Sequence, residues 1–88
     1  MVKKAITIEK GVAIEAATEA LYAIKARLIK LEEAASNIDP AILGEINEFH
    51  IKIVRVVRGL STKTINEIEE IKVAFENKCN EFERLLGG

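Results

Sequence analysis

The chain has 88 residues, 49% of them apolar and 31% charged, with a net charge of −1, which is typical of one small globular domain spanning residues 1–88. This near-neutral charge argues against a general nucleic-acid binder, and no apolar run approaches the ~18 residues that a membrane span needs. The N-terminal lysines have no apolar core behind them, so the segment is not a Sec signal peptide.

Residues 1–7 are predicted to form a short leader, and a first helix is predicted over residues 8–36, beginning between Thr7 and Val12. Its apolar residues alternate in spacings of three and four, the heptad pattern of a helix that packs on another helix along its whole length. This first apolar row consists of Ile14, Ala17, Leu21, Ile24, Leu28, Leu31, Ala35 and Ile38. A neighbouring alanine stripe makes one flank of the helix thin, so that another backbone can approach closely; it consists of Ala13, Ala16, Ala20, Ala23 and Ala34.

A turn is predicted at residues 37–40. Asn37 and Asp39 favour local hydrogen bonds between side chain and backbone, and Pro40 cannot continue a helix from upstream. Asp39 is a good N-cap and Pro40 suits the first position of the next helix. One helix is therefore expected to end here and another to begin, which makes the two antiparallel neighbours.

The rest of the chain carries a second apolar row with helical spacing, interrupted by extra steps of four residues. It consists of Ile42, Ile46, Phe49, Ile53, Val56, Leu60, Thr64, Ile68, Ile71, Phe75, Cys79, Phe82 and Leu86. Because this row passes through Gly59 almost in phase, we predict one long helix over residues 41–86, bent near Gly59. The fold class is then an all-α antiparallel helical hairpin, in which the second helix extends past the first.

A three-helix bundle is the alternative. Gly59 could end a helix, and Thr64 with Glu67 three residues later has the capping-box pattern of a new helix start. The helices would then cover approximately residues 12–36, 40–58 and 63–86. The gap between the last two is short for a chain reversal, which favours the long helix.

Residues 51–57 are rich in β-branched side chains and could form a strand, but the flanking periods are helical. Within a helix, Ile51, Val54 and Val57 widen the apolar face beyond the row, which indicates contact with a second partner. The residues predicted to bind a protein partner are Tyr22, Ile51, Val54, Val57, Leu60, Phe75 and Phe82.

The residues that could carry chemistry are few. His50 is the single histidine and lacks the spacing to other ligands that a metal site needs. Cys79 is the single cysteine, expected to be a buried or half-buried thiol, with an intermolecular disulfide as the alternative. No nucleophile, base and orienting acid stand together, so the sequence predicts no enzyme, no cofactor and no metal site. Four cations without an intervening acid, Lys52, Arg55, Arg58 and Lys63, are interpreted as a solvated face, with phosphate contact as the alternative.

In length and layout the chain resembles the small helical-hairpin proteins of the type VII secretion system, and its opening, Ile6 to Ile14, is similar in style to the accessory proteins of LXG-domain toxins. The resemblance implies a bacterial protein, cytoplasmic or exported by a route other than Sec. It also implies a helical complex with a toxin's N-terminal helices.

Two departures from that family refine the expectation. The turn lacks the Trp-x-Gly motif. The C-terminal export signature of the family, an aromatic residue followed four residues later by an acid, is also absent, since Cys79 follows Phe75 and Leu86 follows Phe82 at that spacing. The resemblance then implies an adaptor or chaperone that helps to present a toxin. A homodimeric four-helix structural or regulatory protein, such as an antitoxin or phage factor, is the first alternative, and a nucleic-acid-associated protein is the second.

Overall fold

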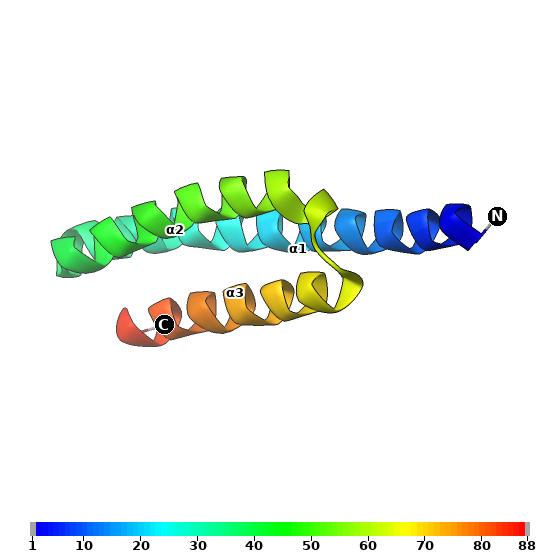
Figure 1. Ribbon diagram of the computed structural model, residues 1–88. Helices are drawn as coiled ribbons and strands as arrows, with labels where there is room; N and C mark the ends of the chain where they lie inside the picture. The colour runs from blue at the N-terminus through cyan, green and yellow to red at the C-terminus, as the bar shows by residue number, and fades with distance from the viewer. Residues whose placement is uncertain (1, 88) are drawn as a thin grey trace.

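The computed structural model describes the backbone of residues 2–87 and the side chains of residues 8–87. The chain forms helix α1 (Val2–Ile38), helix α2 (Pro40–Gly59), a single turn of 3₁₀ helix η1 (Leu60–Thr62) and helix α3 (Ile65–Leu85). Figure 1 shows α2 returning along α1, and α3 running back in the same direction as α1. The bundle is elongated, with extents of 55 × 19 × 16 Å.

Helix α1 begins earlier than predicted, at Val2 rather than between Thr7 and Val12. Gly11 lies inside the helix, at a cost of ~1 kcal/mol relative to alanine. A Cβ at this position would meet nothing within 4 Å. The N-terminal end of α1 extends past the connection between α2 and α3 (Figure 1). The overhang expected of the second helix is therefore found on α1, where Val12 is 63% exposed.

The connection between α1 and α2 is shorter than the predicted turn, because α1 continues through Ile38 and leaves only Asp39 outside a helix. The Asp39 carboxylate accepts a hydrogen bond of 2.9 Å from the backbone N–H of Ala41, and Pro40 occupies the first helical position. Both capping assignments are confirmed. Ile38 ends the first apolar row at 62% exposure, outside the core.

The prediction of one long helix over residues 41–86 is wrong at its middle, where α2 ends at Gly59 and the chain reverses. The reversal fits into few residues because Lys63 and Thr64 both adopt extended backbone conformations after η1. Thr64 and Glu67 then form the capping box, with hydrogen bonds of 2.8 and 3.1 Å. These bonds hold the pKa of Glu67 below its usual value. The three-helix alternative describes the structure.

The core lies between the three helices and consists almost entirely of the two apolar rows. Its buried members are Ala17, Leu21, Ile24, Leu28, Ala35, Ile46, Phe49, Ile53, Leu60, Ile68, Phe75, Cys79 and Phe82. Helix α1 packs against both α2 and α3. The partner helix that the first apolar row requires is therefore supplied twice by the same chain.

Three aromatic rings join α2 to α3 over this core. The Phe49 ring stacks on Phe75 with centroids 4.9 Å apart and meets Phe82 edge-on at 5.8 Å. The ammonium group of Lys78 lies 5.1 Å from the centre of the Phe82 ring and covers it from the outside. Large side chains thus fill the space between α2 and α3. Helix α1 packs against both of these helices along the first apolar row.

Candidate interaction surface

Three of the seven residues predicted to bind a partner are buried, and a fourth is half-buried against the core. Leu60 and Phe82 are 0% and 1% exposed, and Phe75 is 7% exposed. Val57 is half-buried and packs against the core. Phe75 and Phe82 of α3 pack against Phe49 of α2, and Leu60 packs with Ala17 and Ile68. The assignment of Leu60, Phe75 and Phe82 to a partner surface is therefore corrected to the core.

The other predicted residues lie on the outside of α1 and α2. Ile51 is 55% exposed, and it stands two residues from both Phe49 and Ile53, about 200° around the helix from these buried neighbours. Val54 is half-buried and Tyr22 is 48% exposed. The apolar surface that remains after folding therefore includes the outer side of α2.

A contact between α1 and α2 fixes how these residues stand relative to one another. Nε2 of His50 lies 2.9 Å from a carboxylate oxygen of Glu32, although the ring N–H is not aligned for a hydrogen bond. Ile29 precedes Glu32 by three residues and Val54 follows His50 by four, and in antiparallel helices both steps lead the same way. Ile29, 56% exposed, therefore stands level with Val54.

We call the set of Tyr22, Ile29, Ile51 and Val54 the outer apolar patch. The sequence prediction missed Ile29, because it lies outside the first apolar row. Its signal was its place seven residues after Tyr22, which puts both side chains on one side of α1.

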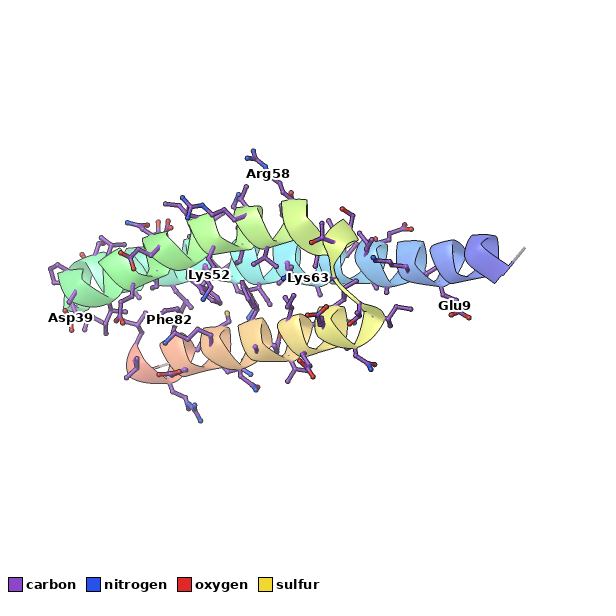
Figure 2. The ribbon with its side chains drawn as sticks, in the orientation of Figure 1. Glu9, Asp39, Lys52, Arg58, Lys63 and Phe82 are labelled. Atoms are coloured by element: carbon purple, nitrogen blue, oxygen red, sulfur yellow. The ribbon has the colours of Figure 1, made fainter. Side chains whose placement is uncertain are left out.

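Cations border this patch on α2. Lys52, Arg55 and Arg58 are exposed, and Lys63 follows in the connection to α3. Arg58 points away from the other helices in Figure 2. Among the ion pairs within residues 8–87, none involves these four cations.

A second polar cluster, centred on Arg27, links α1 to α3 on another side of the bundle. The Arg27 guanidinium donates hydrogen bonds of 2.8 Å to Glu76 and 2.8 Å to Asn80, and it also donates to Glu83. The carboxylates of Glu83 and then Glu76 raise the pKa of Arg27. The side chain stands on the flank of α1 that carries the alanine stripe, where Ala20 borders α3. The cluster therefore fixes the position of α3 along α1.

Replacing Arg27 by methionine is expected to destabilise the isolated chain by about 1–2 kcal/mol, because three acceptors on α3 lose a charged donor that is partly exposed. The loss should shrink at high ionic strength, which screens exposed charges. Urea unfolding at low and high salt measures both effects. Lys30→Met removes an exposed cation three residues away on the same helix and should change stability little. Equal effects of the two substitutions would contradict a specific role of Arg27.

The chemistry of the remaining polar residues is limited. Cys79 is fully buried, as expected, and this burial raises the pKa of its thiol, opposed by the nearby charge of Arg27. No group of three or more His, Cys, Asp and Glu side chains that could hold a metal ion occurs within the described part of the chain. Across residues 2–87, none of the helices has the length and hydropathy to cross a membrane.

No protein-family model matches the chain, and neither the curated proteins nor the solved structures compared with it show a significant match. The class that the fold defines is accordingly an all-α three-helix protein with one long and two shorter helices.

Proposed function

We propose that the chain is a non-enzymatic adaptor that binds a helix of a protein partner along the outer apolar patch. The observation that carries this proposal is the position of Ile51, which faces away from the core of α2 at 55% exposure. Val54 and Ile29 extend the apolar surface from there towards α1. A helix laid over α1 and α2 would cover all of these side chains by helix-in-groove packing.

The partner class follows from the resemblance to the type VII secretion accessory proteins. We propose that the occupant is a helix from the N-terminal region of a secreted bacterial toxin, which the adaptor helps to present for export. The resemblance carries this assignment: the antiparallel pair of α1 and α2 has the hairpin layout of that family, while α3 departs from it. The same proposal covers the localisation of the chain itself. It either stays in the cytoplasm or leaves the cell with the toxin by a route other than Sec.

The homodimeric four-helix alternative receives less support from the packing. Such a dimer would use the apolar rows of two hairpins to build a shared core. Here α3 already covers these rows within one chain, and Leu21, Leu28 and Ile53 are 0% exposed. A partner is thus expected on the outer apolar patch rather than in the core.

Ile51→Asp is expected to abolish capture of the partner by the tagged chain while its helical content stays unchanged. The aspartate would place a charge in the centre of the contact, but Ile51 makes no part of the core. The measurement is co-purification with the candidate toxin domain expressed in the same cells, together with circular dichroism of the isolated variant.

Val73→Asp is the matched control, because Val73 is a β-branched residue with 59% exposure on α3, outside the outer apolar patch. It should capture the partner as the unmodified chain does. Retained capture by the Ile51→Asp variant would show that the partner does not bind at the outer apolar patch.

A further inference from the structure

The outer side of α2 combines apolar and cationic side chains in one stripe. Ile51, Arg55 and Arg58 follow one another at spacings of four and three residues, which places them along the same side of the helix. Lys52 lies beside Ile51 and is also exposed. A helix that covers Ile51 would therefore lie beside two guanidinium groups, one ammonium group and the carboxylate of Glu48.

The acidic residue nearest to these cations in sequence is Glu48, four residues before Lys52, and it lies beside Ile51, Lys52 and Arg55. No acidic residue occurs between Glu48 and Glu67, so the second half of α2 is the part of the chain where positive charge is least balanced. Three cations elsewhere in the bundle differ from these, because Arg27, Lys72 and Lys78 each contact a carboxylate. An occupant of this surface must therefore supply an apolar side chain to cover Ile51 and negative charge to pair with the cations beside it.

We infer that the occupant of this surface is an acidic amphipathic helix, with carboxylates flanking its apolar ridge. This inference rests on the proposed adaptor function and specifies the chemistry of the partner. The apolar ridge covers Ile51 and Val54, and the flanking carboxylates lie within reach of Arg55 and Arg58, whose planar guanidinium groups suit paired carboxylate contacts. The ion pairs at the rim set the orientation and select the partner by charge.

A nucleic acid fits the same surface less well. Binding of single strands uses exposed aromatic rings between the cations, but Phe49, Phe75 and Phe82 are buried beneath α2 and α3. Tyr22, the remaining aromatic side chain, stands on α1. The exposed residue among the cations is instead the aliphatic Ile51, which matches a helix ridge.

A second copy of the chain is the other competing occupant, because α3 itself presents Glu69 and Glu70 near the exposed Val73. That surface is less acidic than its sequence indicates, since Lys72 already contacts Glu69 at 3.4 Å. The partner's helix is therefore expected to carry more acidic residues than α3 can offer.

The test uses two synthetic helical peptides with the same leucine ridge, one with glutamate and one with lysine at the flanking positions. Fluorescence anisotropy measures their binding to the full chain at low and high ionic strength. The glutamate peptide should bind about tenfold more tightly at low ionic strength, since two or three exposed ion pairs separate the peptides. Salt should reduce this difference.

Two double variants locate the effect. Arg55→Glu with Arg58→Glu should reverse the preference in favour of the lysine peptide. Lys72→Glu with Arg84→Glu makes the same two charge reversals on α3, away from the outer apolar patch, and should leave the preference unchanged. A preference that follows net charge alone would appear in both double variants and would overturn the inference.

Further outcomes would also overturn it. They are equal binding of both peptides, binding of neither, displacement of the glutamate peptide by a short DNA duplex at lower concentration, or a salt-sensitive dimer of the chain alone that Arg55→Glu abolishes. If both peptides bind equally and Ile51→Asp still prevents binding, the charge inference fails while the adaptor proposal stands. The two claims can therefore fail separately.

Discussion

Phe82→Ala is expected to destabilise the isolated chain by about 3–5 kcal/mol, enough to unfold most of a domain this small. The Phe82 ring is 1% exposed and meets the Phe49 ring edge-on, so truncation leaves a cavity between α2 and α3. Thermal and urea unfolding followed by circular dichroism would measure the loss. If Phe82 instead bound a partner in an open hairpin, the substitution would hardly affect the chain alone.

Leu85→Ala provides the control on the same helix, since Leu85 is 56% exposed and lies outside the core. We expect a change in the free energy of unfolding within about 0.5 kcal/mol, as for most surface substitutions. Comparable losses for Leu85→Ala and Phe82→Ala would show that the two side chains share one environment, contrary to the structure.

The second large effect is expected at the chain reversal. Replacing Gly59, Lys63 and Thr64 together by alanine should favour a continuous helix through α2 and α3, because it removes the capping box and raises helix propensity across the break. Helix α3 would then pack on α1 of another copy, forming a swapped dimer that reuses the same core contacts. Light scattering over a range of concentrations should show a dimer that the unmodified chain does not form.

The control for this experiment changes two exposed residues of α3 and leaves the break between α2 and α3 unchanged. Asn66→Ala together with Asn77→Ala raises helix propensity within α3 but leaves the capping box in place. This variant should remain monomeric. A monomeric triple variant at millimolar concentration would show that the reversal does not depend on these three residues.

The sequence predicted the content of the core well. Leu21, Leu28 and Ile53 stand at the centre of heptad rows and are 0% exposed. Periodicity identifies such residues because helix geometry alone puts them on one side. The roles of Asp39 as N-cap and of Pro40 as first helical residue were predicted equally well, since capping and proline geometry depend only on neighbouring residues.

The break between α2 and α3 was harder to predict, because both layouts bury the same residues. Leu60 and Ile68 belong to one continuous row whether the chain runs straight or reverses, so the row does not distinguish the two. The deciding signal was the local one, the capping box of Thr64 and Glu67. The reversal needs only two extended residues after η1, fewer than a length argument allows.

The candidate site was predicted in part for a related reason. An apolar row predicts that a side chain is buried, but it does not predict which helix packs against that side chain. Phe75 and Phe82 were therefore assigned to a partner although α2 covers them within the chain. Arg27 was overlooked because its acceptors, Glu76 and Glu83, lie far away in sequence and meet it only after α3 has folded back.

Small-angle X-ray scattering with light scattering on the same sample distinguishes a three-helix bundle, in which one chain covers both apolar rows, from an open hairpin. We expect a monomer of 9.7 kDa with a radius of gyration near 15.1 Å, the value of the Cα trace. A long second helix over residues 41–86 would be about 70 Å long at ~1.5 Å per residue, with a radius of gyration of about 20 Å. A monomer with that larger radius, or an obligate dimer, would show that one chain does not cover both apolar rows by itself.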